Sequence, residues 1–347
     1  MTYKSQDLVK EFDHLVLSTQ GEHTEFKTTS DPQLADQSSL VFLLDIEHAP
    51  SKAAVIVTTE AIAEQLDQNQ YLIVCVADPK FAMAKIKEEY DDYLAGDFEW
   101  DAIHASAVIH SSARLGKDCR VGPNAVVGAN CVIGDNVFIR ATAVIEHDVT
   151  IGDNTIINSG VNIGYGSEIG KGCIIQSNAV IANEGFGFAQ DKNKAYHHVP
   201  HTGNVILEDD VWIGAASCVD RATYGSTIIK RGVKIDNQCH AAHNMLVEED
   251  GLWVAQTGMA GSAKIGKRVI LSGQTGSLDH IKIVDDAVLV HRAGVIKDVT
   301  SAGVWAGIPA VPFREYMRNQ RAPARIDKLE KAFRELKTKL EAKLDLD

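Results

Sequence analysis

An aliphatic residue recurs at every sixth position through the middle of the chain, from Ile103 to Ile181, and all fourteen of these positions are Ile, Leu or Val. This period fits neither an α-helix, which repeats every 3.6 residues, nor a strand, which alternates every two. Gly often follows the repeated residue, with Asp or Asn next, and these types tolerate the backbone angles of tight turns. The pattern predicts short strands with one inward side chain each. Three repeats that close one coil use 18 residues and rise about 4.8 Å.

The repeat is interrupted twice. Residues 182–206 carry no aliphatic repeat and are predicted to form an inserted loop. The period resumes at Leu207, slips by four residues across Thr223–Ser226 and restarts at Ile229. We therefore expect a solenoid over residues 101–311 with one inserted loop.

The two flanks of the solenoid differ from it in kind. Residues 1–100 contain mixed apolar segments such as SSLVFLLDI, which indicate a small α/β domain. Residues 312–347 are predicted to be helical. Their apolar side chains are spaced alternately by three and four residues, which is the pattern of a coiled-coil seam. The seam residues are Ile326, Leu329, Phe333, Leu336 and Leu340.

Composition limits the classes of function. The 347 residues include 34 Lys and Arg and 47 Asp and Glu, and the net charge of −13 argues against a nucleic-acid binder. The first 30 residues lack the basic start and apolar run of a signal peptide. No segment has the roughly 18 apolar residues of a membrane helix. The six cysteines form no CxxC pair. We expect a cytoplasmic protein with at most peripheral membrane contact.

The C-terminal segment is basic, in contrast to the rest of the chain. Residues 312–344 hold ten Lys and Arg and five Asp and Glu, so the remainder carries a net charge of −18. One interpretation is a solvated helix that packs on its symmetry mates. The other adds a docking face for an acidic partner, formed by Arg314, Arg318, Arg321 and Arg325.

Spacing in the solenoid predicts which residues meet, because residues 18 apart stack on the same corner of successive coils. His243 and Gly261 are 18 apart, and Asn244 and His280 are 36 apart, two coils along a neighbouring column. A histidine can take a proton from an attacking amine, and a backbone N–H can stabilise an oxyanion. Asp236 could hold the imidazole in the required tautomer. The arrangement suits acyl transfer, although a lone histidine on a repeat protein is often a solvated turn residue.

The segment 235–244, IDNQCHAAHN, resembles a signature of the UDP-3-O-(3-hydroxyacyl)glucosamine N-acyltransferases, the LpxD family of hexapeptide-repeat acyltransferases. This resemblance implies a mainly β protein, a left-handed parallel β-helix with an N-terminal uridine-binding domain and a C-terminal helical extension. It also implies a homotrimer with active sites between adjacent β-helices. Further matching segments are GFGFA at 185–189, VDRATYGSTII at 219–229, MAGSAKIG at 259–266, GQTG at 273–276 and AGIPAVP at 306–312.

The resemblance also implies roles for individual residues. His243 matches the general base, Asp236 the residue that supports it, and Gly261 the donor of the oxyanion N–H. The implied acyl donor is a 3-hydroxyacyl thioester on acyl carrier protein, and the acceptor is the 2-amino group of a UDP-sugar in lipid A biosynthesis. No metal or redox cofactor is implied, since the phosphopantetheine arm belongs to the carrier protein. The implied substrate-binding residues of the solenoid are Asn237, Asn244 and His280.

The N-terminal segment departs from the family. The uracil pocket of the family uses a segment resembling F-x-x-N-P-K-Y, and here residues 42–48 read FLLDIEH. Phe42, Asp45 and His48 are therefore the candidate nucleotide-binding residues, with altered chemistry at two of these three positions. The change leaves open a related acyltransferase that acts on another nucleotide amino sugar.

Two other classes of function are weighed against the acyltransferase. A γ-type carbonic anhydrase shares the β-helix and binds zinc through histidines, but it needs a pair five residues apart, whereas His240 and His243 are three apart. A non-catalytic scaffold predicts that replacing His243 changes nothing measurable. The role of His240 is open, since it could shift the protonation of the base or point to solvent.

Overall fold

The computed structural model describes residues 2–67, 69–90 and 102–344. The chain divides into two compact units, one over residues 1–99 and the other over residues 100–347. The first unit contains a five-stranded sheet in the order β2-β7-β6-β5-β4, in which β2 is antiparallel to β7 and the other pairs are parallel. Apolar side chains of β5, β6 and β7 are buried on both faces of the sheet, so the predicted α/β organisation is confirmed.

The elements of this unit are short. The sheet strands are β2 (Val16–Gln20), β4 (Thr28–Ser30), β5 (Ser39–Phe42), β6 (Val55–Thr58) and β7 (Leu72–Val76). A separate antiparallel pair is formed by β1 (Tyr3–Lys4) and β3 (Glu25–Phe26). The helices are α1 (Ser5–Glu11), the 3₁₀-helix η1 (Ile46–His48), α2 (Glu60–Ala63) and α3 (Pro79–Tyr90).

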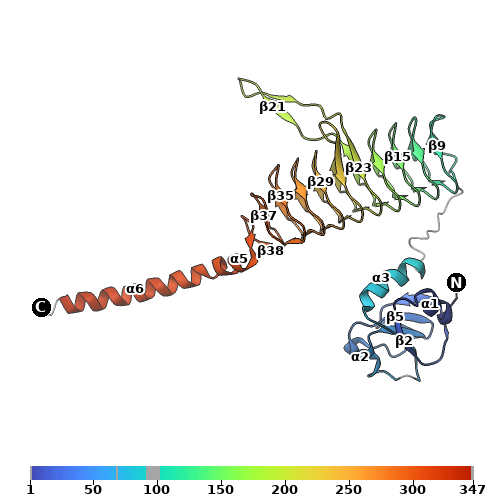
Figure 1. Ribbon diagram of the computed structural model, residues 1–347, viewed down its shortest axis with the longest axis horizontal. Helices are drawn as coiled ribbons and strands as arrows, with labels where there is room; N and C mark the ends of the chain where they lie inside the picture. Colours follow the sequence, from blue (N-terminus) through green and yellow to red (C-terminus); the bar gives the residue numbers. More distant parts are fainter. Residues whose placement is uncertain (1, 68, 91–101, 345–347) are drawn as a thin grey trace. The chain divides into compact units, whose positions relative to one another are not determined.

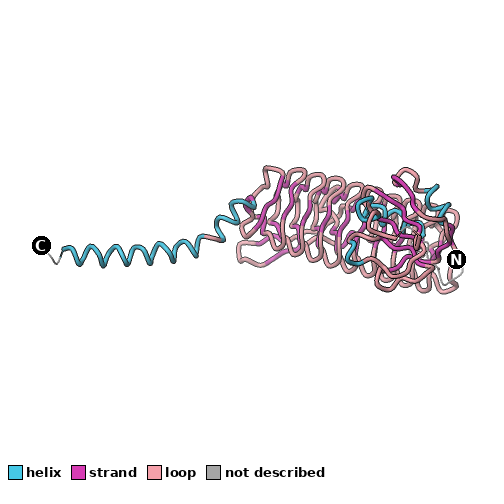
Figure 2. Tube along the Cα trace, turned by 90° about the horizontal axis from the view of Figure 1, so that it is seen from below, coloured by secondary structure: helices cyan, strands magenta, loops and turns pink. Residues whose placement is uncertain are grey.

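The second unit is built on a parallel β-helix (Figure 1). The described strands of the β-helix itself form three sheets of 11, 10 and 9 strands, and Figure 2 shows them as stacked rows along the β-helix. Paired residues on successive coils are 18 apart, as in Val126↔Val144 and Val127↔Ile145. The repeated aliphatic side chains point inward and form one continuous core, as the six-residue period predicts.

The strands follow one another from sheet to sheet. The 11-stranded sheet contains β10 (Arg120–Val121), β13 (Phe138–Ile139), β16 (Ile156–Ile157), β19 (Ile174–Ile175), β24 (Trp212–Ile213), β27 (Lys234–Ile235), β30 (Leu252–Trp253), β33 (Ile270–Leu271), β36 (Ala287–Leu289), β38 (Gly303–Ala306) and β39 (Val311–Pro312). The 10-stranded sheet contains β8 (Val108–Ile109), β11 (Val126–Val127), β14 (Val144–Ile145), β17 (Asn162–Ile163), β20 (Val180–Asn183), β25 (Cys218–Asp220), β28 (His240–Ala241), β31 (Gly258–Met259), β34 (Gly276–Ser277) and β37 (Gly294–Val295). The nine-stranded sheet contains β9 (Arg114–Leu115), β12 (Val132–Ile133), β15 (Thr150–Ile151), β18 (Glu168–Ile169), β23 (Asn204–Leu207), β26 (Ser226–Ile229), β29 (Leu246–Val247), β32 (Lys264–Ile265) and β35 (Lys282–Ile283).

The turn residues have two separate physical roles, which corrects the single role expected for Gly and Asn. Asn130 adopts a left-handed conformation, with φ of 59°, as expected for a tight turn. Gly128 instead allows close packing of coils, because a Cβ there would lie 2.7 Å from the carbonyl carbon of Glu146 in the next coil. Glycine directly after the inward residue is therefore required by contact between coils rather than by its backbone angles.

The turns between sheets stack into three corners. The glutamine corner lies between the 11-stranded and 10-stranded sheets and includes residues 236–238. The histidine corner lies between the 10-stranded and nine-stranded sheets and includes residues 242–244. The charged corner closes the coil and includes residues 248–250. At the glutamine corner the amides of Gln238, Gln256 and Gln274 form a hydrogen-bonded ladder.

Both interruptions of the repeat fall at the histidine corner. The insertion joins β20 to β23, and it forms an antiparallel hairpin of β21 (Phe188–Gln190) and β22 (Tyr196–His198) rather than an irregular loop. This hairpin leaves the side of the β-helix (Figure 1). The four-residue slip lies one coil later, between β25 and β26. The corner that carries His243 is thus the one where the repeat is broken.

The β-helix ends in a short strand pair followed by helices. β38 pairs with the antiparallel β39, and α5 (Phe313–Gln320) and α6 (Ala322–Leu344) follow. The helical prediction is confirmed, and the five seam side chains are 52–74% exposed in the single chain. None of the helices in the described part of the chain combines the length and apolar composition needed to cross a bilayer.

Candidate active site

His243 lies at the histidine corner directly after β28. Because β28 pairs in register with β31, His243 and Gly261 occupy equivalent positions one coil apart. The Ser262 N–H donates to the His243 carbonyl at 2.9 Å, and the His280 N–H donates to the Gly261 carbonyl at 3.0 Å. The stacking predicted from the spacing of 18 residues is therefore present in the structure.

The neighbouring asparagine determines which nitrogen of His243 carries its proton. The Asn244 Oδ1 accepts hydrogen bonds from the Thr223 N–H at 3.1 Å and the Thr223 hydroxyl at 2.9 Å, which fixes the orientation of the amide. His243 Nδ1 lies 2.9 Å from the same oxygen and therefore donates to it. This bond leaves a lone pair on Nε2, which is the form a general base needs. The four-residue slip, which contains Thr223, thus helps to orient the Asn244 amide that holds the His243 ring.

The Gly261 backbone lies directly against the His243 ring. A Cβ at Gly261 would be 2.6 Å from the ring Cε1 and 2.8 Å from Nε2, so the approach requires glycine. Among the residues that the structure describes, none accepts a hydrogen bond from the Gly261 N–H. The site therefore combines a histidine whose Nε2 carries a lone pair with an available backbone donor on the adjacent coil.

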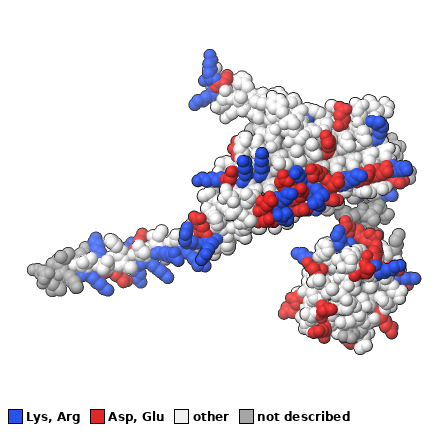
Figure 3. Space-filling view, in the orientation of Figure 1, with Lys and Arg blue, Asp and Glu red and all other residues white. Residues whose placement is uncertain are grey.

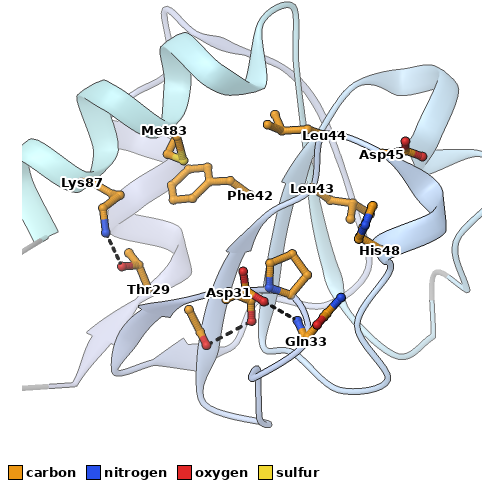
Figure 4. Close-up of a pocket in the computed structure, with 12 residues that line it drawn as sticks. Thr29, Asp31, Gln33, Phe42, Leu43, Leu44, Asp45, His48, Met83 and Lys87 are labelled. Atoms are coloured by element: carbon orange, nitrogen blue, oxygen red, sulfur yellow. Dashed lines mark hydrogen bonds between the residues drawn. The ribbon is translucent and has the colours of Figure 1, made fainter. Parts of the chain in front are cut away.

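A cavity of about 460 Å³ opens in the N-terminal unit (Figure 4). Phe42, at the end of β5, lies beside Met83 of α3 in this view. Asp45 and His48 line the same cavity from η1, and the Asp45 carboxylate accepts a 3.1 Å hydrogen bond from the Glu47 N–H. The three nucleotide-binding candidates of the sequence thus meet in one cavity.

Comparison with known proteins identifies the family. The UDP-3-O-acylglucosamine N-acyltransferase of Methylococcus capsulatus is 47% identical over 293 residues, which cover 82% of this chain and 83% of that protein. This chain belongs to the UDP-3-O-acylglucosamine N-acyltransferase (LpxD) family. The Campylobacter lari protein of the same name is 43% identical over 141 residues, 41% of this chain and 44% of its own length.

Two further likenesses concern the β-helix. Residues 103–185 match the family described as the GMPPB C-terminal domain. The structure of the Arabidopsis UDP-N-acetylglucosamine acyltransferase matches with a TM-score of 0.51 and 20% identity, covering 59% of this chain and 71% of that one. At this identity the likeness shows the fold, and it supports the left-handed parallel β-helix expected for the LpxD family.

The aspartate of the LpxD signature lies at a different corner from the histidine. Asp236 belongs to the glutamine corner, where its carboxylate accepts hydrogen bonds from the Asn237 N–H at 2.7 Å and the Ala255 N–H at 3.0 Å. The Asn237 side chain accepts a 2.7 Å bond from the Ala215 N–H. Asp236 and His243 are seven residues apart, and the strand β28 lies between them, so the two residues belong to successive corners. Within one chain, Asn244 and not Asp236 orients the His243 ring.

Two residues near the LpxD histidine were not predicted from the sequence. The buried His201, from the inserted hairpin, lies edge-on to His243 with ring centroids 4.7 Å apart. The buried Asp220 lies at the end of β25, and its Oδ2 is 3.4 Å from Nε2 of His240. The two interruptions of the repeat were the available signal, since both precede His243 at the same corner. In the described ranges, no group of three or more His, Cys, Asp or Glu is arranged to hold a metal ion.

The four arginines proposed for docking lie on or beside the C-terminal helices and are exposed. Figure 3 shows basic side chains along this segment. Arg318 forms an ion pair of 3.5 Å with Glu315 within α5. The C-terminal segment of this LpxD-family chain therefore presents positive charge to solvent, in line with its composition.

Proposed function

We propose that the protein transfers a 3-hydroxyacyl group to the 2-amino group of UDP-3-O-acylglucosamine, a step of lipid A biosynthesis, with His243 as the general base. The observation that carries this proposal is the His243–Asn244 hydrogen bond beside the available N–H of Gly261. The 47% identity to a UDP-3-O-acylglucosamine N-acyltransferase over most of both chains supports the acceptor.

The geometry suggests the order of chemical events. The amine nitrogen attacks the thioester carbonyl carbon, and Nε2 of His243 takes the amine proton. The Gly261 N–H donates to the oxyanion of the tetrahedral intermediate, an interaction typically worth about 3 kcal/mol of transition-state stabilisation. The C–S bond then breaks, and the thiolate takes the proton from His243. The products are an amide and a free thiol, so protons and electrons balance.

Each unit by itself carries candidate residues for binding the nucleotide sugar. Phe42, Asp45 and His48 line the N-terminal cavity that would take the base. His280 lies exposed two coils from His243, where it could reach a phosphate. The Asn244 Oδ1 is already engaged, so a phosphate contact would use its Nδ2, which donates to the Tyr224 carbonyl at 3.4 Å.

The acyl donor would be a thioester on acyl carrier protein, an acidic partner suited to the exposed arginines at 314–325. The phosphopantetheine arm of that carrier supplies the thiol, so the reaction needs no metal or redox cofactor of its own. We further propose a cytoplasmic homotrimer in which the exposed seam of α6 packs against its copies, because exposed apolar seams at this spacing pair in coiled coils.

A second candidate acceptor is a different nucleotide amino sugar. The Asp45 carboxylate, which lines the N-terminal cavity, favours this alternative, because a carboxylate there selects hydrogen-bond donors on a base. Direct binding of UDP and of other nucleoside diphosphates to the full chain separates the two acceptors. Tight binding of UDP alone supports the first.

The test is N-acylation of UDP-3-O-acylglucosamine by the full chain with 3-hydroxyacyl carrier protein. We expect turnover in the wild type and a loss of about 10³-fold in His243→Ala, the middle of the range of about 10² to 10⁴-fold for a general base. His110→Ala is the matched control, since this exposed corner histidine bonds Ser112 at 2.8 Å and should leave turnover unchanged. An active His243→Ala variant contradicts the assignment of the base, and an inactive, folded wild type contradicts the acceptor or donor.

A further inference from the structure

Asp220 is a buried carboxylate that the proposed chemistry leaves unused. It ends β25 on the outward side, since Val219 before it belongs to the core, yet only 3% of its surface is exposed. Asn183 is its partner on the paired strand β20, and His240 at the rim lies 3.4 Å from its Oδ2. Carboxylates are rarely buried to this extent without a charged partner. We therefore expect a positively charged group near Asp220 that stabilises its carboxylate.

Asp220 faces three histidines. β25 pairs in register with β28, with Val219 opposite Ala241, so Asp220 lies one coil before Ala242, the residue that precedes His243. Burial raises the pKa of Asp220, whereas the charges of His240, His243 and His201 oppose that rise. The carboxylate and the base thus belong to one electrostatic cluster, even though His243 makes its hydrogen bond to Asn244.

The two ends of the insertion, at the base of the hairpin, cover this cluster. The buried Arg221 holds both ends of the insertion, because its Nε donates to the Ala182 carbonyl at 2.9 Å and its Nη1 to the Gly203 carbonyl at 3.3 Å. His201, only 4% exposed, is held over the base by a 2.9 Å bond from its Nδ1 to the Val199 carbonyl. Excluding water on this side strengthens the interaction between the carboxylate and a charge on His243.

We propose that Asp220 is a positioning residue that stabilises the protonated form of His243 during acyl transfer. We further propose that His240, when it is protonated, pairs with Asp220 and thereby weakens this stabilisation. The inference rests on the proposed function. When His243 takes the amine proton, it becomes a cation close to a carboxylate of opposite charge. A protonated His240 pairs with Asp220 and weakens this effect, and a neutral His240 leaves it at full strength.

Other titratable groups at the cluster do not replace Asp220. Glu184, beside the hairpin base, accepts a hydrogen bond from the His201 N–H and pairs with His198 at 3.0 Å. The pKa of the Cys218 thiol is raised by burial and by Asp220, so this thiol stays neutral at physiological pH. On the coils after His243, the charged groups of this corner are the exposed Asp279 and His280, followed one coil further by the exposed Lys297 and Asp298.

The test compares pH–rate profiles of the full chain. We expect Asp220→Asn, which keeps the shape and removes the charge, to lower the plateau of kcat/KM about tenfold and to move the acid limb to lower pH by about 0.5–1 unit. His240→Gln should move the acid limb in the opposite direction, because it removes the cation that competes for Asp220. In the double variant, His240→Gln should have no further effect.

His197→Gln is the matched control. His197 pairs with Asp191 at 3.1 Å on the exposed part of the hairpin, so this change removes a similar ion pair away from the base and should leave the profile unchanged. The proposal is overturned if the acid limb stays in place in both variants, whatever happens to the rate. An inactive wild type would instead contradict the proposed function.

A second measurement does not depend on turnover. The titration midpoint of the His243 ring, followed by NMR in the free protein, should move to lower pH in Asp220→Asn and to higher pH in His240→Gln. If Asp220→Asn does not fold, His240→Gln remains informative, because the His240 side chain is 49% exposed and its replacement leaves the core intact. No shift of the His243 titration in His240→Gln would then contradict the proposal.

Discussion

The histidine corner and the charged corner have the same backbone geometry and different chemistry. Each places one left-handed residue per coil, such as Asn244 and Asp250, both with φ of 60°. At the charged corner, opposite charges on successive coils pair, with Lys230 Nζ 2.9 Å from Glu248 and Arg268 Nε 2.7 Å from Asp286. Figure 3 shows the resulting band of acidic and basic side chains along the β-helix.

The histidine corner differs because its repeat is broken. The insertion brings His201 over the base, and the slip brings Thr223 to the Asn244 amide. A regular corner stacks similar side chains every coil and therefore forms ladders. An irregular corner brings together residues from unequal distances along the chain, and in this protein that is where His243, the Gly261 N–H and the buried Asp220 lie. Pairs of similar substitutions, one at the irregular histidine corner and one at a regular position of the β-helix, test this difference between the corners.

The largest expected effect is at Gly261. In Gly261→Ala the new methyl group would overlap the His243 ring and displace the N–H donor, so we expect kcat/KM to fall between about 10² and 10³-fold. Gly258→Ala is the control, because a Cβ at Gly258 meets nothing within 4 Å. Steady-state kinetics of the two variants measure the difference. Equal activities would show that the close approach has no catalytic importance.

A smaller loss is expected at Asn244. Asn244→Gly keeps the left-handed backbone and removes the acceptor for His243 Nδ1, so the ring loses its fixed tautomer and we expect kcat to fall about 50-fold. Gln256→Gly makes the same kind of change at the glutamine corner, where φ is 63°. This control should retain wild-type kcat. If both variants lose activity alike, the effect is structural and not specific to the base.

The smallest effect is expected at the charged corner. Arg268→Ala breaks an exposed ion pair, so activity should not change and the unfolding midpoint at pH 7 should fall by no more than about 2 °C. The Arg268 guanidinium lowers the pKa of Asp286, so its contribution to stability is present above the ordinary carboxyl pKa and is lost as pH falls through the lowered value. Thermal unfolding should therefore show a smaller difference at pH 3 than at pH 7. A loss of turnover in Arg268→Ala would contradict the separation of the corners.

The predicted fold and family agree with the structure and the comparisons for a physical reason. A six-residue period is a local pattern that is repeated many times, and each repeat places one aliphatic side chain in the same continuous core. The spacing of 18 residues placed Gly261 one coil from His243, and this also follows from counting along a regular structure. The cavity around Phe42, Asp45 and His48 gathers the three residues expected from one segment. Their roles in binding remain predictions.

The details of the site could not be predicted by counting residues along the repeat. Asp236, seven residues before His243, turned out to lie at the glutamine corner, because one strand separates the two turns. The supports of the base come instead from irregular segments, through Thr223 and His201, whose paths no period describes.

By itself, the sequence determined the β-helix, its family, the stacking of His243 on Gly261 and the helical C-terminus. These properties depend on periodic patterns and on motifs that are continuous along the chain. Only the tertiary structure decided that Asn244 orients the His243 ring, that His240 pairs with Asp220, and that this carboxylate is buried. Burial and contacts between coils depend on how the inserted hairpin and the slipped turn fold back on the corner, and no local pattern encodes that.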